Sequence, residues 1–126
     1  FSKDFCSKLK PGNIVALSGS LGAGKTTLVQ MIAKELGIKA RITSPSFTIV
    51  KQYDISPEVR GIKRFCHIDL YRLGENIDDL GFDEYFNDKE SVLFIEWIEK
   101  IKKHLPKDVI WIKISVLKDG TRVIKK

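Results

Sequence analysis

The segment from Gly19 to Thr26 has the composition and spacing of a phosphate-binding loop. It reads Gly-Ser-Leu-Gly-Ala-Gly-Lys-Thr and fits the pattern G-x-x-x-x-G-K-[ST], which chance produces in a chain of this length less than about 1% of the time. Its glycines allow backbone N–H groups to converge on phosphate oxygens without obstruction by side chains. The helix that follows adds unpaired N–H groups and the positive end of its dipole. The loop therefore predicts a site for a nucleoside triphosphate.

Two side chains of this loop have separate predicted roles. We expect the Lys25 ammonium to reach the β- and γ-phosphates and the Thr26 hydroxyl to bind Mg²⁺. The residues that we expect to hold the nucleotide are Gly19, Leu21, Gly22, Ala23, Gly24, Lys25, Thr26 and Thr27. Such a site needs a carboxylate near the metal.

Two carboxylates follow apolar runs that are typical of buried strands. Asp69 follows residues 65–68, and Glu96 follows residues 92–95. A carboxylate at a strand end beside a phosphate loop can bind Mg²⁺ directly or through water, and it can orient or deprotonate the attacking water. The alternative is an exposed acid that caps a turn. Because the chain has both residues and a phosphate loop, we expect at least one of them to serve the metal.

A polar loop, residues 42–47, is expected after the phosphate-loop helix and contains Thr43 and two serines. In phosphate-loop proteins a segment at this place can carry a hydroxyl to the metal or the γ-phosphate, and it can order with the triphosphate and relax after hydrolysis. Thr43 is the candidate hydroxyl. A plain polar connection is the alternative interpretation.

Two further reactive residues, Cys66 and His67, come shortly before Asp69. Cys66 lacks the base and oxyanion arrangement that a nucleophile needs. A histidine in this position is more often a strand residue with satisfied hydrogen bonds than a catalytic base. We therefore assign no chemical role to either residue.

Hydrophobic spacing and turn residues predict a chain in which helices and strands are interleaved. Helices are expected at residues 1–10, 26–36, 77–86 and 98–105, and strands at 13–18, 47–53, 62–70, 91–96, 109–116 and 121–124. The strands at 47–53 and 62–70 should form an antiparallel hairpin, with residues 54–61 as the connection between them. These elements predict the α/β class, with a mixed β-sheet flanked by helices as in phosphate-loop NTPases, in one three-layer domain over residues 1–126.

Charge is unevenly distributed along the 126 residues. Residues 1–68 carry a net charge of +7, residues 69–99 carry −8, and residues 100–126 carry +7, which gives +6 in total. Solvated helix faces explain such blocks most simply, although a surface for a partner protein or RNA would give the same pattern. No apolar run approaches the roughly 20 residues that span a bilayer. The two widely spaced cysteines favour a reducing cytoplasm.

Four segments, in order, resemble the TsaE family of bacterial ATPases. Residues 21–27, Leu-Gly-Ala-Gly-Lys-Thr-Thr, resemble its L-G-A-G-K-T-T, and residues 43–48, Thr-Ser-Pro-Ser-Phe-Thr, resemble its S-P-T-[FY]-T segment. Residues 67–73, His-Ile-Asp-Leu-Tyr-Arg-Leu, match its H-x-D-x-Y-R-L, and residues 95–99, Ile-Glu-Trp-Ile-Glu, are similar to its I-E-W-P-E. The phosphate loop is generic, whereas the last two segments are specific. The resemblance covers nearly the whole chain.

The resemblance implies an ATPase that uses Mg²⁺ and converts ATP to ADP and phosphate. TsaE proteins act with TsaB and with the transferase TsaD in making threonylcarbamoyladenosine at position 37 of tRNAs that read ANN codons, and hydrolysis is thought to reset the complex. By position, Lys25 would bind phosphates, and Thr26 and Glu96 would bind Mg²⁺. Asp69 would support the metal or the water, and Thr43 would be a switch hydroxyl. The tRNA would be reached through the complex, and no membrane would be involved.

The chain departs from the family pattern at three places. Ser20 stands where the family usually has Asp, Ser46 replaces a Thr, and Ile98 replaces a Pro. None of these changes removes a phosphate or metal ligand. Family members usually begin with a further short stretch that helps to hold the nucleotide base. We expect that stretch to be missing here, which would leave the base pocket incomplete.

Three other functions compete with this interpretation. A small kinase or other phosphotransferase would need an acceptor-binding domain and an arginine-bearing lid, but residues 69–99 contain only Arg72 and Lys89 as cations. A GTPase would need an N-K-x-D segment, and residues 87–90 have the wrong order. A nucleotide-gated binding module with negligible turnover overlaps with the ATPase, since activity could depend on the complex.

Overall fold

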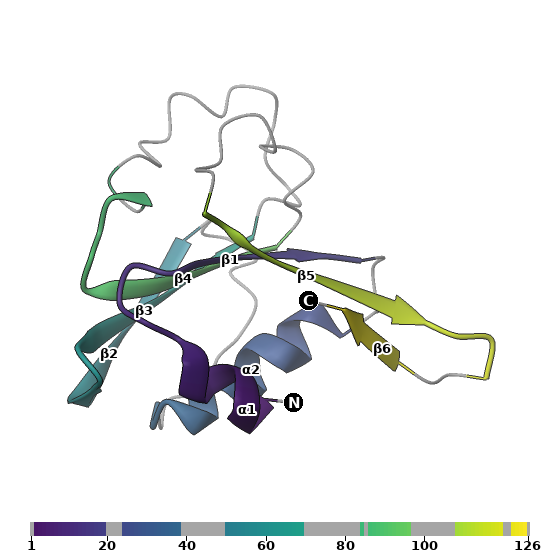
Figure 1. Ribbon diagram of the computed structural model, residues 1–126, viewed down its shortest axis with the longest axis horizontal. Helices are drawn as coiled ribbons and strands as arrows, with labels where there is room; N and C mark the ends of the chain where they lie inside the picture. Colours follow the sequence, from purple (N-terminus) through teal and green to yellow (C-terminus); the bar gives the residue numbers. More distant parts are fainter. Residues whose placement is uncertain are drawn as a thin grey trace.

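A six-stranded mixed β-sheet with two helices against one face forms the described part of the protein (Figure 1). The computed structural model describes residues 2–19, 24–38, 50–69, 84, 86–96, 108–119 and 122–125. Its elements are α1 (Ser2–Lys8), β1 (Ile14–Ser18), α2 (Lys25–Glu35), β2 (Val50–Val59), β3 (Ile62–Asp69), β4 (Ser91–Glu96), β5 (Ile110–Val116) and β6 (Arg122–Lys125). The predicted α/β class with a mixed sheet is confirmed. No helix among the described residues is long and apolar enough to cross a membrane.

The strand order places four parallel strands at the centre of the sheet. The order is β2-β3-β4-β1-β5-β6, in which β3, β4, β1 and β5 are parallel and the two edge strands are antiparallel to their neighbours. The carboxyl ends of parallel strands meet at one edge of a sheet, where ligands bind in open α/β folds. The phosphate loop after β1, Asp69 at the end of β3 and Glu96 at the end of β4 therefore share that edge.

The hydrophobic core lies between the sheet and the two helices. Alternate residues of the central strands face the helices, among them Val15 and Leu17 of β1 and Phe94 of β4. The residues of α1 and α2, with the one residue that follows each helix, that complete this core are Phe5, Cys6, Leu9, Leu28, Val29, Ile32, Ala33 and Leu36. Apart from Phe1, which lies outside the described residues, these are the helix residues that the sequence predicts to be apolar faces. Burial of this face fixes the position of α2 relative to the strand ends.

Most strand and helix boundaries agree with the predictions to within one or two residues, and β4 agrees at both ends. The helices predicted at 77–86 and 98–105 lie outside the described residues, except that Glu84 and Phe86 are helical. The polar loop at 42–47 also lies outside them. The four central strands and α2, which position the candidate site, were thus all predictable from hydrophobic spacing.

The hairpin of β2 and β3 differs from the prediction, because the connection is much shorter than residues 54–61. Strand β2 continues to Val59, which pairs with Ile62 across a two-residue turn. Both turn residues have positive φ, 50° at Arg60 and 85° at Gly61, which matches the twist of a tight hairpin. Pro57 suggested a loop, but β2 is an edge strand, where a missing N–H is tolerated. An irregular register between Asp54 and Val59 accommodates it.

The hairpin turn also holds the amino-terminal helix in place. The Arg60 guanidinium donates hydrogen bonds to the carbonyl oxygens of Cys6 and Leu9, the latter at 3.4 Å. These carbonyls lie at and just after the carboxyl end of α1, where the regular helical hydrogen bonds end, although the Cys6 carbonyl also accepts a hydrogen bond from the Leu9 N–H at 3.2 Å. Arg60 thereby connects α1 to the far end of the hairpin.

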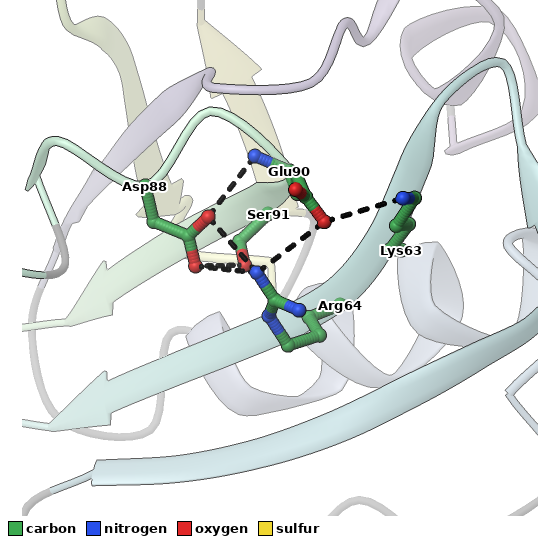
Figure 2. Close-up of polar contacts among 5 residues, drawn as sticks. All are labelled: Lys63, Arg64, Asp88, Glu90 and Ser91. Carbon is green, nitrogen blue, oxygen red and sulfur yellow. Dashed lines mark hydrogen bonds and ion pairs between the residues drawn. The ribbon is translucent and has the colours of Figure 1, made fainter.

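A cluster of charged residues fixes the start of β4, at the end of the sheet opposite the phosphate loop (Figure 2). Asp88 accepts hydrogen bonds from the Ser91 hydroxyl at 2.6 Å, from the Glu90 backbone N–H at 3.0 Å and from Arg64 at 3.1 Å. Glu90 is 3.4 Å from Lys63 and 3.8 Å from Arg64. Burial alone would raise the pKa of the Asp88 carboxyl, but these donors outweigh burial and lower it below its usual value.

We expect Asp88→Asn to reduce stability in a manner that depends on pH. A lowered pKa in the folded state stabilises the protein above the unfolded pKa, about 3.9, and this contribution is lost as pH falls through the folded value. Near pH 6 the variant should lose about 1–3 kcal/mol of unfolding free energy, and the difference from wild type should shrink toward pH 2. Urea unfolding monitored by circular dichroism over this range measures both effects.

The matched control is Asp4→Asn, because Asp4 forms an exposed ion pair with Lys8 at 3.4 Å. Such pairs contribute little to stability, so this variant should follow wild type at every pH. A constant difference between wild type and Asp88→Asn from pH 6 to pH 2 would contradict the assigned role of the carboxylate.

Candidate functional site

The amino-terminal end of α2 lies at the carboxyl edge of the sheet and begins at a glycine in a left-handed conformation. Gly24 has φ 98° and ψ 23°, and its carbonyl accepts the first helical hydrogen bond from the Leu28 N–H at 2.9 Å. Only a residue without Cβ adopts this backbone at little cost. Gly24 also has no side chain that could cap the helix. The N–H groups of the first turn can therefore serve an anion such as a phosphate.

Lys25 spans the two ends of the phosphate loop. Its side chain is buried, with 5% of the residue exposed, and its ammonium donates a hydrogen bond of 2.6 Å to the carbonyl oxygen of Gly19. Gly19 follows β1 directly, and Lys25 is the first residue of α2. The positive charge is thus held against the loop rather than extended into solvent. It is placed where an anion bound by the loop would meet it.

Thr26 and Glu96 meet across 70 residues of sequence. The Thr26 hydroxyl lies 3.2 Å from each oxygen of the Glu96 carboxylate, and Glu96 is only 2% exposed. A hydroxyl and a carboxylate supply the oxygen ligands that Mg²⁺ prefers. No group of three or more His, Cys, Asp or Glu side chains among the described residues could hold a metal ion. Thr26 and Glu96 are therefore the described residues that could supply ligands to a cation at this edge of the sheet.

Asp69 is placed beside Glu96 by the register of the sheet. The Cα atoms of Asp69 and Glu96 are partners in the parallel pairing of β3 with β4. The backbone thus places the two predicted residues side by side at the ends of neighbouring strands. Thr27 is exposed on α2, whereas Leu21, Gly22, Ala23 and Thr43 lie outside the described residues.

His67 is a member of this site to which the sequence assigned no role. The residue is completely buried, and its Nε2 forms a hydrogen bond with Oε2 of Glu96. A spacing of two residues along β3 puts His67 on the same face as Asp69. The two-residue spacing between His67 and Asp69 can be seen in the sequence. Its meaning depends on the register of β3 against β4, which the sequence does not show.

Cys66 lies on the opposite face of β3 from His67 and takes no part in the site. Burial is the main reason why the pKa of the Cys66 thiol is raised, so the thiol remains protonated and unreactive near neutral pH. Cys6 and Cys66 are both buried free thiols. The sequence-based interpretation of Cys66, without a nucleophilic role, agrees with this environment.

Comparisons with known proteins extend over almost the entire chain. A family profile described as "Threonylcarbamoyl adenosine biosynthesis protein TsaE" matches residues 1–124. The chain is 40% identical over 115 residues to the tRNA threonylcarbamoyladenosine biosynthesis protein TsaE of Bacillus subtilis, covering 91% of this chain and 69% of that protein. Its identity to the TsaE protein of Treponema pallidum is 39% over 118 residues, covering 92% and 82%.

A solved structure is similar over the same length. The crystal structure of YdiB from Bacillus subtilis matches with a TM-score of 0.78 and 37% sequence identity, covering 98% of this chain and 72% of that chain. The sheet, the phosphate loop and both strand-end carboxylates therefore lie within the region of similarity.

Proposed function

Because the chain belongs to the TsaE family of threonylcarbamoyladenosine biosynthesis proteins, we propose that it is the magnesium-dependent ATPase of that machinery. The observation that carries this proposal is the contact between the Thr26 hydroxyl and the buried Glu96 carboxylate at the start of α2. A hydroxyl and a strand-end carboxylate in this arrangement are the protein ligands that phosphate-loop NTPases provide for Mg²⁺.

The residues predicted from the sequence have separate tasks in this proposal. The first-turn N–H groups of α2 bind phosphate oxygens, and Lys25 exchanges its contact with the Gly19 carbonyl for the β- and γ-phosphates. Thr26 and Glu96 would hold Mg²⁺, which would supply positive charge to neutralise the phosphoryl group. We assign Asp69 to the support of the metal or the attacking water, and Thr43 to a switch hydroxyl that responds to the γ-phosphate.

The proposed partners are the TsaB and TsaD proteins, with hydrolysis of ATP to ADP resetting their complex between cycles. This part of the proposal rests on the resemblance in the phosphate-loop, H-x-D-x-Y-R-L and I-E-W segments, together with family membership. Transfer RNA would be reached through the complex. We propose the cytoplasm as the compartment, in keeping with two buried free thiols.

Replacement of Lys25 by Ala should weaken ATP binding at least about tenfold, because a charge-assisted contact with the phosphates is lost. Isothermal titration calorimetry with ATP and Mg²⁺ measures the dissociation constant. Lys34→Ala is the matched control, since Lys34 is exposed on the same helix, and it should bind as wild type does. Unchanged affinity in Lys25→Ala would remove the phosphate-loop assignment.

Replacement of Glu96 by Gln should lower Mg²⁺-dependent ATP hydrolysis about 10- to 100-fold. Gln keeps the size of the side chain and an acceptor for the Thr26 hydroxyl but removes the negative charge. Phosphate release measures the rate, and thermal unfolding shows whether the fold is intact. A folded variant with wild-type turnover would transfer the metal role from Glu96 to Asp69.

Tagged TsaD should capture this chain in the presence of TsaB and ATP, and ADP should weaken the capture. The physical reason is that only the triphosphate can hold the proposed switch hydroxyl of Thr43 through its γ-phosphate. The controls are the same capture experiments with TsaB left out and then with TsaD left out. Equal capture with ATP, with ADP and without nucleotide would argue against a nucleotide-driven cycle.

A further inference from the structure

We infer that His67 is a positioning residue for Glu96: its Nε2–H holds Oε2 of the carboxylate so that the other oxygen, Oε1, is presented to the metal beside the Thr26 hydroxyl. This inference rests on the proposed function, because it concerns how the magnesium ligand is oriented. It gives a role to a residue that contacts the proposed metal ligand Glu96.

The contact lies where the hydrophobic core gives way to the polar edge of the sheet. Along the helix-facing side of β3, Phe65 comes first, then His67, then Asp69. Phe65 stacks on Phe94 of β4 with ring centroids 4.9 Å apart. His67 is the Cα partner of Phe94, and Glu96 is two residues further along β4 on the same face. The imidazole therefore reaches diagonally from the end of the aromatic core to the carboxylate.

The hydrogen-bond environment of the ring indicates which nitrogen carries the proton. His67 Nδ1 is buried and has no hydrogen-bond partner among the described residues, so a proton there would be an unsatisfied donor. Nε2 faces a carboxylate oxygen, which can only accept. The tautomer with the proton on Nε2 satisfies both conditions, and Nε2–H donates to Oε2 of Glu96.

The unpartnered nitrogen also indicates why a histidine stands here. An apolar residue would fill the end of the core without leaving a buried polar atom unsatisfied, and each such atom calls for an explanation. The hydrogen bond to Glu96 explains the histidine, because a carboxylate with 2% exposure needs hydrogen-bond donors to be stable in the protein interior. Its two described donors are the Thr26 hydroxyl and His67.

Metal binding would affect the two hydrogen-bond donors of Glu96, Thr26 and His67, in different ways. Thr26 would turn a lone pair of its hydroxyl to the metal, so its contact with Glu96 must readjust. His67 forms its hydrogen bond with Oε2 and is paired with Phe94, two residues before Glu96 in β4, so this hydrogen bond can persist when Oε1 binds the metal. Partners of this kind orient metal ligands, and their loss typically costs 10- to 100-fold in metal affinity or activity.

A matched pair of amide variants tests this role. In His67→Gln the amide nitrogen reaches about as far as Nε2, whereas in His67→Asn it reaches only as far as Nδ1. The readout is the ratio of dissociation constants for N-methylanthraniloyl-ATP measured in EDTA and in MgCl₂, which reports the metal site without hydrolysis. For His67→Gln we expect a ratio within about threefold of the wild-type ratio. For His67→Asn we expect the ratio to fall about tenfold.

Two further variants separate positioning from packing. His67→Phe has no donor but suits the neighbouring aromatic residues, and it should lose about as much of the ratio as His67→Asn. If His67→Asn does not fold, His67→Phe alone tests whether the hydrogen bond to Glu96 is needed for metal binding. Phe94→Leu disturbs the same part of the core and leaves the donor in place. It should lower the unfolding temperature while retaining the wild-type ratio.

The outcomes distinguish this inference from the proposed function. If Mg²⁺ strengthens nucleotide binding in wild type but the folded donor-free variants keep the full ratio, the positioning role is overturned and the ATPase proposal stands. Equal losses in His67→Gln and His67→Asn would also overturn it. If Mg²⁺ does not strengthen binding in wild type, the proposed metal site itself fails.

Discussion

The buried carboxylate of Glu96 is the group on which the rest of the site depends. A negative charge that is 2% exposed is stable in a protein only when donors or cations surround it. Two donors, Thr26 and His67, come from α2 and β3 respectively. The hydrogen bonds that this one carboxylate requires therefore link the start of α2 to the two neighbouring strands β3 and β4. A small change in any of them would disturb the ligand geometry proposed for Mg²⁺.

The sheet makes this arrangement possible by fixing β4 at both ends. At its start, Asp88 accepts hydrogen bonds from Arg64 and the Ser91 hydroxyl, and at its end Glu96 forms hydrogen bonds with Thr26 and His67. Between these ends every residue of β4 is buried. The first cluster has only structural partners, so its lowered carboxyl pKa stabilises the fold. The second consists of residues to which we also assign metal binding, so it serves the proposed function as well as the fold.

Hydrophobic spacing was enough to predict α2 and β4, because their apolar residues repeat with the period of a helix or form a continuous buried strand. It could not predict the turn at Arg60, where tertiary contacts with α1 favour a positive φ in a residue other than glycine. Asp69 and Glu96 were found as strand-end acids from local sequence. His67 was not, since its role depends on the pairing of two strands, β3 and β4, that are separated by residues 70–90 of the sequence.

The pairing of β3 with β4 also explains why the H-x-D and I-E-W segments together say more about function than the phosphate loop does alone. A phosphate loop specifies a triphosphate and little else. The parallel register of β3 and β4 places Asp69 opposite Glu96 and puts His67 within reach of the same carboxylate. The two segments are thus two strands of one site, in which one residue orients another. The arrangement of His67, Asp69 and Glu96 in two paired strands links the family resemblance to the proposed chemistry.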